Sequence, residues 1–487
     1  MFSIIKGLVN YAINEKLITD DDRVYITNSL LKELNISDYK DEEAVALPLA
    51  TLLDKINDYA VDNGFINNTL TERDLFDTRI MGILLDRPSN IFNSFEEKYR
   101  KSPKEATDYF YHIATKANYI RLDRIQKDIK WKTKTRYGIL DITINLSKPE
   151  KDPQEIAMAK LHPTTHYPKC LLCRENEGYM GRFNHPAREN LRLIPLTLGK
   201  EAFYMQYSPY VYYNEHIIVL SQEHKPMIID EKVFEKLLDF VDLFPHYFIG
   251  SNADLPIVGG SILTHEHFQG GNYEFAMDKA ETLYSFSLDG CKAEVLKWPL
   301  STIRLKSTDK NSILNTANYI FNKWLSYNDF DNMIYASTDG VRHNTITPIV
   351  RKMDDEYIIN LVLRNNLTTN QFPFGLYHPH SEYHHLKKEN IGLIEVMGLA
   401  ILPRRLKDEL EEIKEAILTN TEFNAKIKKH EEWINSLKKQ YTLTKDNINE
   451  ILQQEIGYRF SLILDDAGVF KQNSTGINAF KKFTSTL

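Results

Sequence analysis

The sequence predicts an α+β protein: a mainly antiparallel sheet with helices on one face, duplicated in tandem and extended by helices at both ends. Apolar residues follow helical spacing up to about residue 130 and again from Arg404 onward. Between these stretches, alternating apolar and polar residues indicate short strands. The order of strands and helices in 131–290 recurs loosely in 291–403. The predicted units are therefore a helical extension (1–130), two related halves (131–290 and 291–403) and a second helical extension (404–487).

The N-terminal extension contains several helical patterns. Apolar residues recur at helical spacing between Val24 and Leu34 and between Leu47 and Ile56. Thr69 or Thr71 is suited to cap the next helix, because a threonine hydroxyl accepts a hydrogen bond from a backbone N–H of the first turn. One long helical stretch is predicted from Phe92 to Ile129.

The first half is predicted to consist of strands around one helix. Ile142, Ile144 and Leu146 alternate with polar residues, which is typical of a half-buried strand. A helix capped by Asp230 is expected over 231–244, because its apolar residues share one face. The other predicted strands are Ala202–Tyr207, Ile217–Ser221, His246–Ser251 and the segment around His265.

The second half follows a similar order. A strand over Thr302–Lys306 precedes a helix over Ile313–Trp324, and Pro348–Lys352 and Tyr357–Arg364 form a hairpin. His378-Pro379-His380 follows, about 113 residues after an earlier His-x-His. This spacing suggests a duplicated domain in which only one copy keeps its chemistry.

Composition excludes several classes of protein. The 487 residues are 42% hydrophobic and 26% charged, which is typical of a soluble globular chain. The net charge of −7 argues against a dedicated nucleic-acid binder. No apolar run is long enough to span a membrane, and the first residues lack the features of a signal peptide. Three cysteines in so long a chain indicate the reducing cytoplasm.

The most informative motif is His265-Glu266-His267-Phe268-Gln269. In an extended strand, alternate side chains share a face, so both histidines and Gln269 would point into one pocket. This set suits attack on phosphorus, with one imidazole as nucleophile, the other as ligand or positioner, and an amide to hold a phosphate oxygen. The alternative is chance, since fifteen histidines in this chain will produce some His-x-His pairs.

Four segments together resemble the galactose-1-phosphate uridylyltransferases of the histidine-triad superfamily. The segments are Cys170-Leu171-Leu172-Cys173, Ser221-Gln222-Glu223-His224-Lys225-Pro226, Pro256-Ile257-Val258-Gly259-Gly260-Ser261 and His265-Glu266-His267-Phe268-Gln269. The resemblance is closest to the second, Firmicute-type class and covers nearly the whole chain. It implies that both halves are histidine-triad-like.

The resemblance implies a ping-pong transferase of galactose metabolism. Such an enzyme moves a uridylyl group from UDP-glucose to galactose 1-phosphate, giving UDP-galactose and glucose 1-phosphate. His267 corresponds to the family nucleophile, and Gln269 to the glutamine that hydrogen-bonds the phosphate of the uridylyl-histidine intermediate. A cytoplasmic homodimer is expected by the same resemblance. Glu266 and Phe268 depart from the first class, which has proline and glycine there, and this departure puts a close backbone contact in doubt.

Cys170, Cys173, His224 and His265 form a Cys₂His₂ set that suits tetrahedral zinc, and the two cysteines have a usual zinc spacing. The matching residues of the first class bind structural zinc. The alternatives are two buried cysteines or a redox pair. Cys291 has no evident partner and is expected in the core.

Further residues are candidates for substrate contacts. The backbone amides of Gly259, Gly260 and Ser261 could stabilise phosphate charge. Gln206 and Tyr207 lie where the family contacts uridine, and Asn252 could meet the ribose or phosphate. The same segment contains Tyr204, Ser208 and Tyr210, while Arg182, Asn184, Arg188 and Lys225 are candidate phosphate neighbours. The alternative is that these tyrosines pack a core and that the charged side chains are solvated.

A second cluster contains His378, His380, Glu382, His384 and His385. These residues either bind a second metal or serve as polar structure. Lys387, Lys388 and Glu395 are alternative contacts for a sugar phosphate. Two other functions stay open: a dinucleoside polyphosphate hydrolase or phosphorylase, distinguished by a purine preference, and a UDP-sugar-binding protein without turnover, distinguished by the lack of a covalent adduct.

Overall fold

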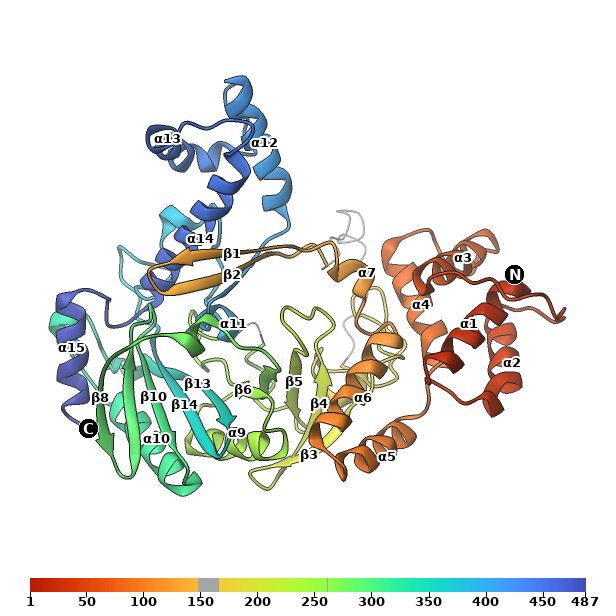
Figure 1. Ribbon diagram of the computed structural model, residues 1–487, viewed down its shortest axis with the longest axis horizontal. Coiled ribbons are helices and arrows are strands. Elements are labelled where there is room, and N and C mark those ends of the chain that lie inside the picture. Colours follow the sequence, from red (N-terminus) through yellow and green to blue (C-terminus); the bar gives the residue numbers. More distant parts are fainter. Residues whose placement is uncertain (148–165, 261) are drawn as a thin grey trace.

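The computed structural model describes residues 1–147, 166–260 and 262–487. Its centre is an antiparallel sheet in which ten described strands follow the order β3-β4-β5-β7-β6-β13-β14-β10-β9-β8 (Figure 1). The strands are β3 (Ile194–Leu198), β4 (Glu201–Tyr207), β5 (Ile217–Ser221), β6 (Phe248–Gly250), β7 (His267–Gly271), β8 (Thr282–Leu288), β9 (Cys291–Leu296), β10 (Thr302–Ser307), β13 (Asn344–Met353) and β14 (Glu356–Asn365). The predicted α+β class is confirmed.

The sheet consists of two copies of one plan. The first copy runs β3-β4-β5, helix α9 (Glu231–Leu243), β6 and β7; the second runs β8-β9-β10, helix α10 (Lys310–Leu325), β13 and β14. In each copy the last strand lies between the third and the fourth. The fourth strands, β6 and β13, join the copies through the pairs Gly250–Ile349, Ile249–Val350 and Phe248–Arg351. The duplicated plan predicted from the sequence is confirmed.

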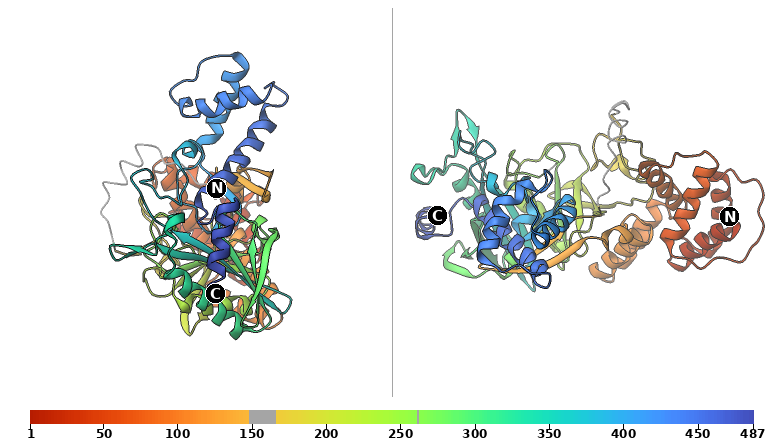
Figure 2. Two further views of the ribbon diagram at one scale, coloured as in Figure 1. Left: turned by 90° about the vertical axis from the view of Figure 1, so that its left-hand side faces the viewer. Right: turned by 90° about the horizontal axis from the view of Figure 1, so that it is seen from above.

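The helices α9 and α10 cover the same face of this sheet (Figures 1 and 2). The side chain of Asp230 caps α9 by accepting a hydrogen bond from the Lys232 backbone N–H, with an N···O distance of 3.0 Å. Apolar residues of both helices and of the strands beneath them form one continuous buried core. We call this side of the sheet the helix face and the other side the open face.

The two His-x-His segments, whose spacing suggested a duplication, do not lie at equivalent positions in the two structural copies. The counterpart of β7 is β14, which contains no histidine, whereas His378 and His380 lie in the loop that follows β14. The two His-x-His segments are therefore not equivalent. The second copy lacks histidines at the position where the first copy has His267 and Gln269.

A small second sheet lies over the open face (Figure 1). It contains β1 (Ile129–Thr135), β2 (Gly138–Ile144) and β15 (Leu399–Leu402), with β15 parallel to β2. The strand predicted from the alternation up to Leu146 therefore exists, but it does not join the main sheet. Its buried residues Leu140, Ile142 and Ile144 belong instead to a second apolar core that includes α14 (Ile448–Ala467).

The N-terminal extension consists of helices at the β3–β4 end of the main sheet (Figure 1), and its apolar residues belong to the same core as that sheet. The helices are α1 (Phe2–Asn14), α2 (Arg23–Glu33), α3 (Leu49–Asp62), α4 (Leu70–Ile83), α5 (Pro88–Tyr99), α6 (Pro103–Lys116) and α7 (Leu122–Ile125). Thr69 caps α4 by accepting from the Glu72 N–H at 3.2 Å. The single long helix predicted from Phe92 is wrong. Ser102 has extended backbone and caps α6, and Pro103 at the first helical position cannot continue α5.

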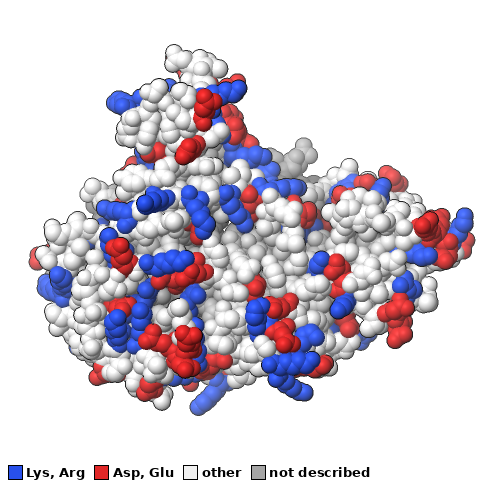
Figure 3. Space-filling model, viewed as in Figure 1, with Lys and Arg blue, Asp and Glu red and all other residues white. Residues whose placement is uncertain are grey.

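The C-terminal extension projects from the sheets and then returns to them (Figures 1 and 2). Its helices are α12 (Arg405–Thr419), α13 (Glu431–Gln440), α14 and α15 (Ser474–Thr484). None of the described helices combines the length and apolar character needed to cross a bilayer. Acidic and basic side chains are interspersed on the face seen in Figure 3.

Candidate functional site

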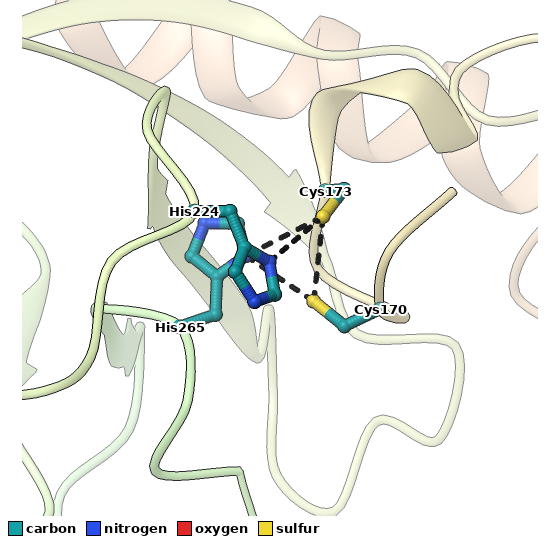
Figure 4. Close-up of side chains that lie close together, drawn as sticks. All are labelled: Cys170, Cys173, His224 and His265. Carbon is teal, nitrogen blue, oxygen red and sulfur yellow. Dashed lines mark hydrogen bonds between the residues drawn. The ribbon is translucent and has the colours of Figure 1, made fainter. Parts of the chain in front are cut away.

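Four side chains converge just before β7 (Figure 4). Cys170 Sγ lies 3.2 Å from His265 Nδ1, and Cys173 Sγ lies 3.2 Å from His224 Nδ1. The two sulfurs are 3.5 Å apart, and the four possible ligand atoms all lie within 4.8 Å of one another. A single tetrahedral ion has bonds of about 2.3 Å to sulfur and about 2.0 Å to nitrogen, so the group fits such an ion after small adjustments.

Neighbouring groups fix the orientation of these ligands. His265 Nε2 donates to the Ser221 carbonyl at 2.9 Å, which leaves the Nδ1 lone pair directed at the sulfurs. The Asn176 amide donates to the carbonyls of Cys170 at 2.9 Å and Cys173 at 2.8 Å, so it holds the turn between them. Asn176 was not predicted as a site residue, because its hydrogen bonds to the cysteine carbonyls exist only in the folded turn.

The surroundings of the two cysteines disfavour the redox alternative. Burial raises the pKa of the Cys170 thiol to about 12. A redox pair needs a thiol with a lowered pKa, usually at a helix N-terminus, whereas Cys173 precedes only a short 3₁₀ turn. Burial also lowers the pKa of His265, which favours the neutral imidazole that a metal requires.

The second histidine of the motif has a different environment. β7 begins at His267, so His265 lies outside the strand, and its ring faces the cysteines. The expectation that one strand directs both imidazoles into one pocket is therefore wrong. His267 Nδ1 donates to the His265 carbonyl at 2.8 Å, which leaves Nε2 with the lone pair. Burial lowers the pKa of His267 to about 4, so the ring is neutral at pH 7.

Gln269 lies two residues further along the same face of β7 and borders a cavity of about 790 Å³. Its side chain lies beside the buried ring of His216. Asn252, Gly259 and Gly260 border the same cavity. Gly250 on β6 pairs with Gln269, so the residues that follow β6, including Asn252, continue from the strand next to Gln269. Two amides, those of Asn252 and Gln269, thus border the cavity, and the neutral imidazole of His267 lies two residues before Gln269 on the same strand.

The glycine pair is required by close packing. A Cβ on Gly260 would lie 2.7 Å from the Asn252 amide nitrogen, and one on Gly259 would lie 2.6 Å from the Ala253 carbonyl oxygen. Asn252 Oδ1 accepts from the Leu393 N–H at 2.8 Å. Asn252 therefore ties the glycine pair to the loop before β15. Ser261 lies outside the described residues.

The two candidates on β4 are separated by the pleat of the sheet. Gln206 pairs with Ile218, which pairs with Gln269, so these three side chains share the open face. Tyr207 points the other way, and its hydroxyl donates to the Thr107 carbonyl at 3.0 Å within the core. The expectation that Tyr207 contacts a ligand is therefore wrong.

A second cavity of about 290 Å³ lies between α4, the loop after Cys173 and Tyr210. Its lining includes Arg182, Asn184 and Arg188, three of the candidate phosphate neighbours. Tyr210 borders this cavity and Tyr212 borders the larger one, and their rings stack at 6.0 Å. The two cavities are therefore neighbours.

The second half contributes charged groups to the larger cavity. Lys387 is buried there with its Nζ 2.9 Å from Glu395 Oε1. Arg364 on β14 is buried close to Glu395, and burial lowers its pKa to about 10. Arg364 was not predicted as a site residue. A charged residue inside the apolar run of β14 nevertheless indicates a buried charge that needs a partner.

The second histidine cluster does not converge. His378 Nε2 lies 3.2 Å from Asn390 Oδ1, His380 lies beside Asp466, and His385 Nδ1 lies 2.8 Å from His430 Nδ1. Among the described residues, only the group of Cys170, Cys173, His224 and His265 has the geometry of a metal site. Polar structure is therefore the better account of these histidines.

Comparison with known proteins agrees with this geometry. The family model "Galactose-1-phosphate uridyl transferase, N-terminal domain" matches residues 16–226, and its C-terminal counterpart matches residues 239–435. Proteins named galactose-1-phosphate uridylyltransferase from Clostridium acetobutylicum and Bacillus subtilis are 50% and 46% identical, over 99% of this chain and 99% and 97% of theirs. Among solved structures, yeast Ap4A phosphorylase Apa2 aligns with a TM-score of 0.33 and 12% identity, covering 67% of this chain and 90% of that one. The chain belongs to the galactose-1-phosphate uridylyltransferase family.

Proposed function

We propose that this chain transfers a uridylyl group from UDP-glucose to galactose 1-phosphate through a covalent intermediate on His267. Family membership supports the overall reaction. The observation that carries the mechanism is the hydrogen bond from His267 Nδ1 to the His265 carbonyl, which leaves Nε2 as the free nucleophilic nitrogen of a neutral ring.

In the first step, His267 Nε2 attacks the α-phosphorus of UDP-glucose. The new N–P bond forms as the bond from the α-phosphorus to the bridging oxygen breaks, and its electron pair leaves with glucose 1-phosphate. The ring becomes positively charged as it bonds to phosphorus. The His265 carbonyl accepts from the Nδ1–H and stabilises that charge.

In the second step, a phosphate oxygen of galactose 1-phosphate attacks the same phosphorus, and His267 leaves with its electron pair. UDP-galactose is released and the neutral imidazole is restored. Two in-line displacements at one phosphorus give net retention of configuration. The Gln269 amide borders the larger cavity, so its nitrogen is suited to donate to a phosphate oxygen in both steps.

The two neighbouring cavities suit the two ends of a UDP-hexose. Lys387 and Asn252 border the larger cavity beside Gln269 and can meet the sugar phosphate. Arg182, Arg188 and Tyr210 border the smaller one, where an aromatic ring and guanidinium groups suit a nucleotide. We propose that uridine lies toward the smaller cavity and that Gln206, on the open face, lies between the two cavities.

Cys170, Cys173, His224 and His265 are proposed to hold a structural zinc ion. Bound there, zinc would cross-link the cysteine turn to the segment that precedes His267. A homodimer, supported by resemblance, and a cytoplasmic location, supported by the low cysteine count, belong to the same proposal.

The test is the intact mass of the protein after mixing with UDP-glucose alone. We expect a gain of one uridylyl group in the wild-type protein and none in His267→Ala. UDP-glucose binding without a mass gain would contradict the transferase and favour a binding protein. Adduct formation with a purine dinucleotide instead would favour a dinucleoside polyphosphate enzyme.

A further inference from the structure

The residue between the two histidines of the motif faces the opposite side of the sheet. Glu266 is 5% exposed, and its Oε1 accepts a hydrogen bond from Lys236 Nζ at 2.8 Å. Lys236 belongs to α9 and is 3% exposed. A lysine buried in the apolar face of a helix is stabilised only when its charge is paired. The glutamate of the motif provides that pairing.

The pair is part of a neutral group of two lysines and two glutamates. Lys236 Nζ also lies 3.2 Å from Glu201 Oε1, and Lys225 Nζ lies 3.1 Å from Glu266 Oε2. Lys225 and Glu201 form a further ion pair. The more exposed pair therefore closes the group toward solvent, while Lys236 and Glu266 form its buried end.

One peptide unit connects this ion group to the nucleophile. The N–H of Glu266 donates to the Lys225 carbonyl at 2.7 Å. The carbonyl of the same peptide unit, that of His265, accepts from His267 Nδ1 at 2.8 Å. Because a peptide is planar, rotating this unit would move both groups together. The ion pairs of the Glu266 side chain therefore restrain the peptide unit whose carbonyl accepts from His267.

We infer that Lys236 and Glu266 are positioning residues for His267. By fixing the peptide unit between His265 and Glu266, they hold the carbonyl that selects the Nδ1–H tautomer and restrains the ring of His267. The consequence for catalysis rests on the proposed uridylyl transfer. The consequence for the ring itself does not, since it concerns the free protein.

The test compares Glu266→Gln with Glu294→Gln. Glu294 is also a buried strand glutamate paired with two lysines, Lys292 and Lys306, but it lies on β9 in the second half. Nitrogen-15 NMR of histidine-labelled protein would report the tautomer of His267, identified by the signal that His267→Asn removes. We expect one Nδ1–H form in the wild type and in Glu294→Gln. In Glu266→Gln we expect a mixture of tautomers.

Kinetics provide the second measurement. The rate constant for adduct formation from UDP-glucose should fall by about 10- to 100-fold in Glu266→Gln, with the KM changed less than about twofold, because misplacing a nucleophile by about 1 Å costs up to about 100-fold. Lys236→Met should cause a similar loss, and the double variant should lose no more than the worse single variant, because both act through one contact. Zinc content should stay unchanged.

The inference is overturned if Glu266→Gln keeps the wild-type tautomer and a rate within about twofold of wild type. Loss of zinc in parallel with the rate would also overturn it, because the effect would then be a general loss of structure. If no protein forms an adduct, the proposed transferase fails, while the NMR comparison still decides whether Glu266 orients His267.

Discussion

The reactivity of His267 depends on which ring nitrogen carries the proton. A backbone carbonyl rather than a carboxylate accepts from Nδ1, so no neighbouring negative charge raises the pKa of the ring. Burial then keeps the imidazole neutral, and Nε2 can attack phosphorus without first losing a proton. In the proposed transfer, desolvation and one hydrogen bond would thus suffice to make His267 a nucleophile.

The amide of Gln269 should matter more for rate than for binding. We expect Gln269→Ala to lower the rate constant of adduct formation by about 100-fold, because removing one donor from a developing charge typically costs about that much. The KM for UDP-glucose should change far less. Stopped mixing followed by intact-mass measurement would check both values. Gln454→Ala, on the exposed side of α14, is the matched control, and an equal loss there would contradict the role of Gln269.

The residues at the site differ in how far the sequence reveals them. His267 and Gln269 lie in one short motif and Cys170 and Cys173 in another, whereas His224 and His265 joined the metal candidates through the family resemblance. Asn176 holds a turn that forms only in the folded chain. Lys236 and Arg364 are charges buried beside partners that are distant in sequence, and a single sequence does not show which buried charges meet. Tyr207 was misassigned because neighbouring strand residues face opposite sides, and only the pairing of β4 fixes which side is which.

At the scale of elements, the turn containing Cys170 and Cys173 is held to β5 and β7 through the proposed metal. We expect about one zinc per chain by elemental analysis. Cys173→Ser should lose most of it and unfold at lower temperature, since structural zinc contributes directly to folding. Cys291→Ser, which alters a buried cysteine on β9, should keep its zinc. Equal zinc in both variants would contradict the assignment.

Most strands and helices of the two halves could be predicted, because the strands are short apolar runs and the helices carry apolar residues at helical spacing. The errors have local physical causes. Pro103 divides the long helix predicted from Phe92, and the short β6 keeps only three paired residues of the predicted strand His246–Ser251. The partner of β2 lies over 250 residues away on β15, and strand alternation carries no information about so distant a neighbour.

At the scale of the whole molecule, the two copies of the sheet contribute different residues to the candidate site. The first carries His267, Gln269 and the candidate metal ligands, whereas the second carries Lys387 and Glu395, which border the same cavity as Gln269. The cavity therefore requires both copies in one fixed arrangement. That arrangement depends on the pairing of β6 with β13 and on the packing of α9 against α10.

The two halves should consequently unfold as one unit. Val350 is fully buried and pairs with Ile249 across the junction, so Val350→Asp would introduce an uncompensated charge there. We expect it to lower the free energy of unfolding by about 3–5 kcal/mol. In a background in which Trp131 and Trp433 are replaced by phenylalanine, fluorescence of Trp298 and Trp324 reports the second half, and exposure of the Cys170 and Cys173 thiols reports the first. Both transitions should move together, whereas Val341→Asp, at a 62% exposed site, should move neither. If only the tryptophan signal shifted while the thiols stayed protected, the halves would be independent, and the shared cavity could not account for activity.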